Sequence, residues 1–127
     1  MSEDLKVVGQ SVLRRDGVGH VTGKTQYIDD ISFPDMLHLK MVRSPLHHAR
    51  IRGIDFSEAE KVPGFVRAFT YKDVPKNLYT ILCLIGIGPD EEPVLAEDVV
   101  RFKGEQIAAI VAESEAAANE AVARVRL

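Results

Sequence analysis

An uninterrupted apolar run at residues 107–112, Ile-Ala-Ala-Ile-Val-Ala, constrains the fold of this chain more than any other feature. Such a run predicts a strand covered on both faces, because a half-buried strand would alternate apolar with polar residues. Ser114 then occupies the position of a helix N-cap, and Glu115 lies in the first turn, where the helix dipole favours an acid. The apolar residues of this helix fall on one stripe, which faces a sheet. They are Ala117, Ala118, Ala121, Val122 and Val125.

The first two-thirds of the chain predict mainly strands and turns. Asp16-Gly17 has the form of a hairpin turn between strands at residues 11–15 and 18–22. Residues 37–42 show the period of two that is typical of a half-buried strand. Ser57–Glu60 has the form of a capping box and predicts a short helix. Because strands dominate, with one clear C-terminal helix and one short helix, the predicted fold class is α+β.

Length and charge limit the possible classes of protein. The 127 residues predict a single domain spanning 1–127, with a loose polar start at residues 1–5. The net charge of −3, with acids and bases mixed along the chain, argues against nucleic acid as a partner. No apolar run approaches the roughly 20 residues that a membrane span needs. The acidic start also lacks the regions of a signal peptide, so we expect a cytoplasmic protein without a membrane partner.

Two residue groups resemble ligand sites, but each has a plainer interpretation. Gly86-Ile87-Gly88 could cradle a phosphate, yet a proline and three acids follow, and a simple turn is favoured. His47 and His48, with His20 and His38 elsewhere, could bind a metal ion. Adjacent histidines on a strand point to opposite faces, so exposed or hydrogen-bonded histidines are the favoured interpretation.

Carboxylate clusters and one cysteine complete the set of chemically interesting residues. Asp29-Asp30, expected at the end of a short strand, and Asp90-Glu91-Glu92 both lie in predicted turns, where acids are usually solvated. Cys83 lies within the apolar run 81–85, where a buried thiol would be inert. As the only cysteine, it excludes an intrachain disulfide. We therefore assign no catalytic, cofactor-binding or metal-ligating residue from the sequence.

Four segments, taken in order, resemble parts of one known family. The first comprises Arg15-Asp16-Gly17 and Val21-Thr22-Gly23-Lys24, with Tyr27 and Asp30. The second, residues 42–51, reads Val-Arg-Ser-Pro-Leu-His-His-Ala-Arg-Ile, and the third is Pro63-Gly64-Phe65-Val66. The fourth comprises Pro93-Val94-Leu95-Ala96, Val100, Arg101, Gly104, Gln106 and Val111-Ala112-Glu113. Together they resemble the N-terminal α/β-hammerhead domain of the large, molybdenum-binding subunit of xanthine dehydrogenases and aldehyde oxidases.

The resemblance implies a two-layer α/β-hammerhead and a structural role in a larger enzyme. Full-length members oxidise aldehydes, purines and other N-heterocycles at molybdenum bound to a pterin. Their electrons pass to iron–sulfur clusters and often to FAD. The implied partners are the downstream molybdenum-binding domains of the same subunit and the iron–sulfur and flavin subunits or domains. Because the family's cofactor-holding residues lie downstream, none is carried onto this chain, which is predicted to be inactive and cofactor-free in isolation.

Departures from the family pattern leave the substrate and the subfamily open. Asp35 stands where the family usually has glycine, Leu46 stands where histidine is common, and residues 76–92 follow no family pattern. Two alternatives to a hydroxylase domain are the same domain in a reductase of aromatic acyl thioesters and a free-standing binding module. The chain ends directly after the predicted helix, from which we expect a truncated chain.

Surface exposure distinguishes a scaffold domain from a self-contained one. A scaffold domain is expected to expose apolar side chains in residues 44–51 and 76–89, because the rest of the subunit would cover them. Alternatively, both segments fold into the domain's own core, and the sequence does not decide between these two outcomes.

Overall fold

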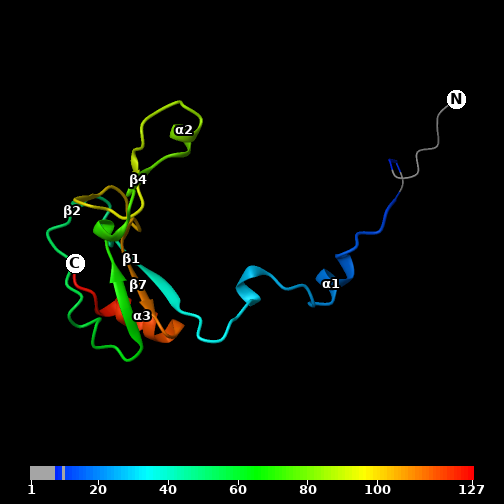
Figure 1. Ribbon diagram of the computed structural model, residues 1–127, viewed down its shortest axis with the longest axis horizontal. Coiled ribbons are helices and arrows are strands. Elements are labelled where there is room, and N and C mark those ends of the chain that lie inside the picture. The colour runs from blue at the N-terminus through cyan, green and yellow to red at the C-terminus, as the bar shows by residue number, and fades with distance from the viewer. Residues whose placement is uncertain (1–7, 10) are drawn as a thin grey trace. The chain divides into compact units, whose positions relative to one another are not determined.

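The computed structural model describes residues 8, 9 and 11–127, and its contacts divide the chain into two units, Met1–Pro34 and Asp35–Leu127. The predicted loose start at residues 1–5 lies outside the described residues. The first unit contains helix α1 (Gly17–Val21) and the 3₁₀ helix η1 (Ile28–Asp30). The second contains β1 (His38–Arg43), β2 (Ala49–Arg50), β3 (Phe65–Phe69), the 3₁₀ helix η2 (Tyr71–Asp73), β4 (Leu78–Tyr79), α2 (Ile81–Leu84), β5 (Glu92–Pro93), β6 (Val99–Val100), β7 (Gln106–Ala112) and α3 (Glu115–Arg124) (Figure 1).

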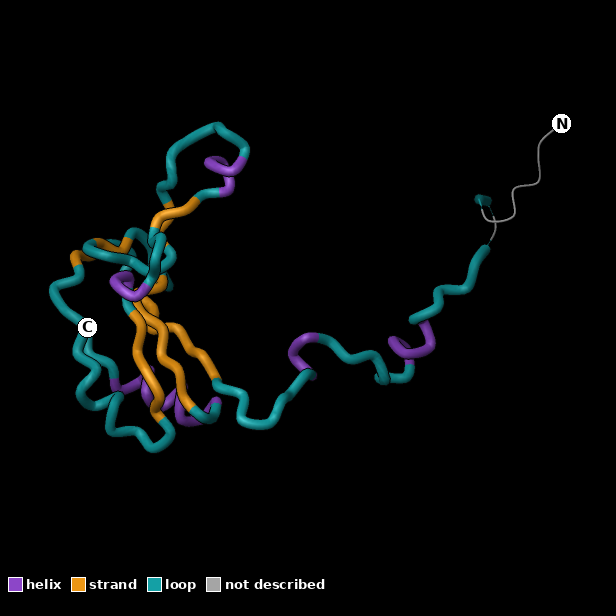
Figure 2. Tube along the Cα trace, in the orientation of Figure 1, coloured by secondary structure: helices purple, strands orange, loops and turns teal. Residues whose placement is uncertain are grey.

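A three-stranded antiparallel sheet forms the centre of the second unit, with the strand order β1-β7-β3. The predicted apolar strand is β7, and it lies in the middle, as Figure 2 shows. Its register places Ile110 opposite Lys40 of β1 and Ala68 of β3. Ile110 is fully buried, so the prediction of a strand covered on both faces is confirmed.

Helix α3 covers one face of this sheet and begins where the sequence predicts. The Ser114 hydroxyl accepts a hydrogen bond from the Ala117 backbone N–H at 3.1 Å, which satisfies one of the free donors at the helix start. Ala117, Ala118 and Ala121 are buried against the sheet. Their small side chains allow a close approach, and they form a single core with Ile110 and with residues of the neighbouring strands and turns.

Two small strand pairs extend this frame. Strand β2 pairs with β6, and a second core of Ala96, Val100 and Ile107 lies beside them. Strand β4 pairs with β5 and carries the segment that contains α2. Strands around one long helix agree with the predicted α+β class.

Three local predictions are wrong. Asp16-Gly17 forms the start of α1 instead of a hairpin turn, because Asp16 bonds to His20 one helical turn later. The strand expected before Asp29-Asp30 is η1, where the Asp30 carboxylate accepts a hydrogen bond from the Tyr27 N–H at 2.9 Å. The Ser57–Glu60 segment forms turns and no regular helix, since its first N–H is bonded by Asp55 and Pro63 follows closely.

Strand β1 buries a different face from the one that its leucines suggest. Leu39 is 53% exposed, whereas Val42 on the opposite face is 4% exposed and packs in the α3 core. On the α3 side, the Lys40 ammonium donates to the Glu115 carboxylate at 2.7 Å, which lowers the pKa of Glu115. The lysine stem can therefore lie along the helix while its charge is paired at the surface.

Candidate functional site

The Arg-Ser-Pro segment, the most distinctive motif of the sequence, forms a structural joint. Ser44 is buried, and its hydroxyl donates to the Leu46 carbonyl at 2.9 Å and accepts from the Leu46 N–H at 3.1 Å. The backbone of Ser44 bonds to both Gly104 and Glu105, and the Arg43 guanidinium donates to the Gly104 carbonyl at 2.8 Å. The motif therefore fastens the end of β1 to the turn before β7.

The Pro-Gly segment has a similar structural role beside α3. Gly64 adopts a φ of +83°, and its carbonyl accepts a hydrogen bond from the Glu113 N–H at 2.8 Å. A Cβ built on Gly64 would lie 3.5 Å from that of Ala117, so the turn rests directly on the start of the helix. Glycine is favoured here because other residues are strained at positive φ. The turn fixes the entry into β3.

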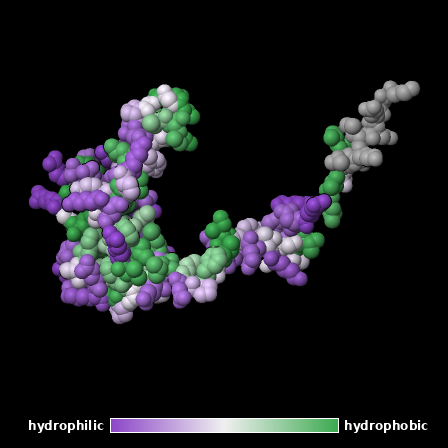
Figure 3. Space-filling model, viewed as in Figure 1, coloured by the Kyte–Doolittle hydropathy of each residue, from purple (hydrophilic) through white to green (hydrophobic). Residues whose placement is uncertain are grey.

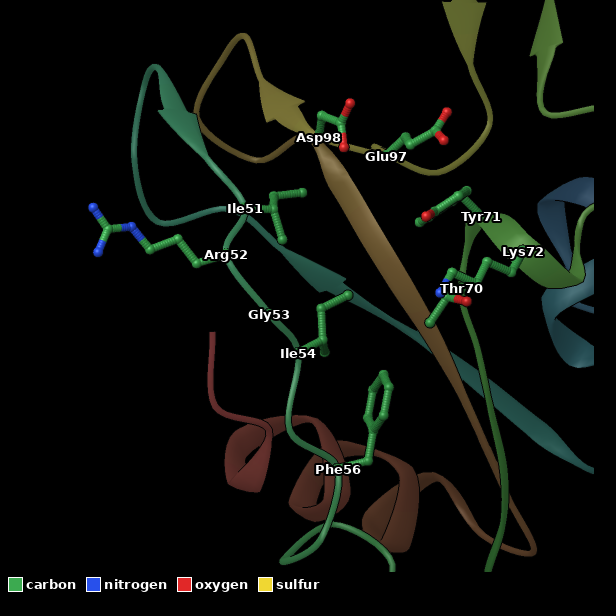
Figure 4. Close-up of a pocket in the computed structure, with 10 residues that line it drawn as sticks. All are labelled: Ile51, Arg52, Gly53, Ile54, Phe56, Thr70, Tyr71, Lys72, Glu97 and Asp98. Carbon is green, nitrogen blue, oxygen red and sulfur yellow. The ribbon is translucent and has the colours of Figure 1, made fainter.

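An open groove with a volume of about 330 Å³ lies beside the turn after β3. Figure 4 shows Ile54 and Phe56 pointing into it, Tyr71 across from them, and Arg52 pointing away. The acids Glu97 and Asp98 lie at its edge. Among the described residues, every buried polar side-chain atom already has a hydrogen-bond partner. Nothing buried in the groove therefore requires a ligand.

The glycine and acid motifs lie in the same projecting segment. Gly86-Ile87-Gly88 forms an exposed turn, as predicted. Asp90 pairs with the Lys76 ammonium at 2.6 Å and accepts a hydrogen bond from the Thr80 N–H at 3.1 Å. The Lys76 hydrogen bond holds the pKa of Asp90 below its usual range. This acid is thus a structural ion-pair partner and not a poised proton donor.

The histidines are distributed over both units. His47 and His48 are exposed in the bend after β1, and His38 lies at the start of that strand. Within the described part of the chain, no three His, Cys, Asp or Glu side chains are grouped as a metal ion would require.

A hydrogen-bonded chain of side chains in the first unit escaped sequence reasoning. The Asp16 carboxylate lies 3.0 Å from His20 Nε2, and His20 Nδ1 lies 2.8 Å from the Tyr27 hydroxyl. The Arg14 guanidinium, 2.5 Å from Asp16, lowers the pKa of that carboxyl. The four-residue step from Asp16 to His20 was the available signal, since such a step aligns side chains only on a helix. The chain of bonds ties α1 to η1.

The apolar run 81–85 is exposed in the structure, which corrects the idea of a buried thiol. Helix α2 lies within an apolar loop tip, which we define as residues 78–87. Cys83 is exposed. The large exposed apolar side chains of the tip are Leu78, Tyr79, Ile81, Leu82, Leu84, Ile85 and Ile87. In contrast, Ile51 of the other candidate segment packs against the second core, while its neighbour Leu46 is exposed.

Comparison with known proteins connects these features. A family model described as "Aldehyde oxidase and xanthine dehydrogenase, a/b hammerhead domain" matches residues 22–127. The chain belongs to this family. The hammerhead segment is 42% identical over 117 residues to part of a probable xanthine dehydrogenase of Bacillus subtilis, covering 92% of this chain and 15% of that protein. It is 39% identical to the nicotine 6-hydroxylase large subunit of Paenarthrobacter nicotinovorans, covering 91% of this chain and 14% of that protein.

Solved structures extend the likeness to three dimensions. The hammerhead chain matches the aldehyde oxidoreductase of Desulfovibrio gigas with a TM-score of 0.81 and 38% identity, over 89% of this chain and 13% of that one. The aldehyde oxidoreductase of Desulfovibrio desulfuricans gives a TM-score of 0.84 and 37% identity, over 93% and 14%. The predicted two-layer hammerhead fold is thereby confirmed, and the chain spans about 15% of the length of the first curated relative.

Proposed function

We propose that this chain is the hammerhead scaffold domain within the large subunit of a molybdenum hydroxylase. One observation carries the proposal: the likeness to solved enzymes extends over 89–93% of the chain, with TM-scores of 0.80–0.84. Relatives bear names such as "large subunit" and "subunit gamma", which supports a place in a multi-part enzyme. Within such an enzyme, the domain would pack against the molybdenum-binding domains.

For the whole protein we propose oxidation of an aldehyde, a purine or another N-heterocycle. A relative from Eubacterium barkeri is named a "large molybdopterin subunit", and one solved relative is a "Cu,Mo-CO Dehydrogenase", which supports a molybdenum–pterin cofactor. Iron–sulfur clusters and FAD would belong to other domains or subunits. The cytoplasm is the proposed location. In the described chain, no helix combines the length and hydrophobicity that a membrane crossing requires.

The residues of this chain do not fit the cofactor itself. Its exposed glycine turn is followed by Asp90 and Glu91, whose charges would repel the phosphate of a pterin cofactor. The buried motif residue Ser44 already bonds within the domain. We therefore propose a structural role, in which the motif residues hold the sheet and helix in the geometry that neighbouring domains contact.

Domain replacement tests this function. In the nicotine 6-hydroxylase large subunit, the segment matched by this chain would be exchanged for the present sequence. We expect the chimera to assemble and to hydroxylate nicotine within about tenfold of the native rate, which is about 1.4 kcal/mol of barrier. The control is the same large subunit with the segment deleted, which is expected to be inactive. A chimera no more active than the deletion, although this chain folds alone, would contradict the scaffold function.

A further inference from the structure

The apolar loop tip, residues 78–87, is held in a projecting position by its base. Strands β4 and β5 pair below it, and the Lys76–Asp90 ion pair joins the two strands of the segment at 2.6 Å. The Thr80 hydroxyl accepts a hydrogen bond from the Leu82 N–H at 3.3 Å and so starts helix α2. Figures 1 and 2 show the tip extending away from the central sheet.

The exposure of the tip is unusual for a surface loop. Leu84 is 85% exposed and Ile81 is 72% exposed, and neither belongs to the two cores of the unit. Figure 3 shows hydrophobic residues gathered at the end of this projection. No charged residue interrupts the sequence from Leu78 to Pro89. Contiguous apolar surface of this kind marks an interaction site in stable proteins.

We propose that the tip inserts into an apolar crevice, rimmed by basic residues, in the remainder of the molybdenum hydroxylase large subunit. This inference rests on the proposed function and specifies the surface that the scaffold uses. The matched relatives hold about 85% of their length outside the segment that this chain covers, so they contain ample protein to form such a crevice. The acids Asp90, Glu91 and Glu92 flank the tip, against the single base Lys76, which favours a basic rim.

The same observations argue against two other occupants. A membrane with anionic headgroups would repel the flanking acids. A second copy would have to offer a concave site, since two projecting tips cannot enclose each other. The most apolar cavity of this unit, beside Leu46 and Ile107, has a volume of about 240 Å³. That is below the roughly 300–1,000 Å³ of a drug-sized ligand site, so it could take one or two of the seven side chains.

Cys83 provides a direct probe, because it is exposed in the tip and is the only cysteine of the chain. Its alkylation by N-ethylmaleimide would be followed by peptide mass spectrometry in the isolated chain and in the nicotine 6-hydroxylase chimera. We expect labelling in the chimera to be at least about tenfold slower, which corresponds to 1.4 kcal/mol of protection. Equal labelling rates in an active chimera would overturn the tip inference and leave the scaffold function intact. An unassembled, inactive chimera would overturn both.

A triple variant tests whether apolar burial provides the docking energy. Ile81→Ser, Leu84→Ser and Ile85→Ser together should leave the unfolding midpoint of the isolated chain unchanged, because these side chains are exposed. In the chimera, the variant should lower recovered activity at least about tenfold and restore Cys83 labelling. The matched control, Ile81→Leu, Leu84→Ile and Ile85→Leu, retains apolar surface and should retain both activity and protection. An unaffected chimera carrying the serine variant would overturn the inference.

Two further measurements on the isolated chain test the other occupants. A dimer in light scattering that the serine variant dissociates would assign the tip to a second copy. Co-sedimentation with phosphatidylcholine vesicles that the serine variant abolishes would assign it to a lipid surface. Either result would overturn the proposal.

Discussion

Replacing Ile110 with alanine tests the packing of β7 against α3, on which the whole domain depends. Ile110 is fully buried in the middle strand, within a core that includes Val42, Val62 and the alanines of α3. The substitution removes three carbon atoms, and at about 0.8 kcal/mol for each the transfer cost is about 2.4 kcal/mol. Alanine neighbours have no side chain that could fill the resulting cavity, so we expect a total cost of about 3–4 kcal/mol.

Urea unfolding of the full chain measures this cost. With a slope of about 1–3 kcal/mol/M, the midpoint should fall by at least about 1 M while the slope stays unchanged. The matched control is Leu39→Ala, an aliphatic truncation in the neighbouring strand at a position that is 53% exposed. We expect the control to cost less than about 1 kcal/mol in the isolated chain. Equal effects of the two substitutions would refute the assignment of the α3 side as the buried face of the sheet.

Three further substitutions test separate contacts. Ala121→Leu should destabilise the domain by about 1–3 kcal/mol in urea unfolding, because the helix has no space for a larger side chain at this fully buried position; an unchanged midpoint would mean that α3 does not pack there. Gly64→Ala should cost about 1–2 kcal/mol, since Gly64 adopts a φ of +83°, and an alanine variant as stable as the parent would contradict that turn geometry. Lys76→Gln should raise the pKa of Asp90 in a carboxyl NMR titration, because the Lys76 hydrogen bond is the main cause of its lowered pKa. A lowered folded-state pKa contributes stability above the unfolded pKa that is lost as the pH falls through the folded value, so Lys76→Gln should also weaken the acid dependence of stability; an unshifted Asp90 would refute the ion pair.

The sequence predicted the C-terminal strand and helix because local signals and tertiary packing agree there. The apolar run of β7 and the alanine stripe of α3 each show one unbroken period, and Ser114 marks the boundary between them. The confirmed Glu120–Arg124 ion pair follows from the same helical spacing. The family resemblance, carried by residues such as Ser44 and Gly64, also predicted the hammerhead fold, since these residues form its turns and joints.

Other features depend on contacts that no local pattern contains. The period of two in β1 predicted a strand, but α3 covers the face of Val42 and Lys40 and leaves Leu39 exposed. The run 81–85 has the composition of a buried strand, and only the whole structure shows that it lies outside both cores. Asp16-Gly17 suits a hairpin turn equally well, but the hydrogen bonds of Asp16 to Arg14 and His20 select a helical turn. Such choices depend on partners elsewhere in the structure.

The molybdenum content of the isolated chain and of the nicotine 6-hydroxylase chimera tests the central claim most directly. Both proteins would be purified, treated with a chelator and analysed by inductively coupled plasma mass spectrometry. A scaffold domain predicts about one molybdenum atom per chimera, as in the native enzyme, and essentially none in the isolated chain. Stoichiometric molybdenum that survives chelation in the isolated chain would contradict a purely structural role, and a molybdenum-free chimera would contradict the placement of this chain in such an enzyme.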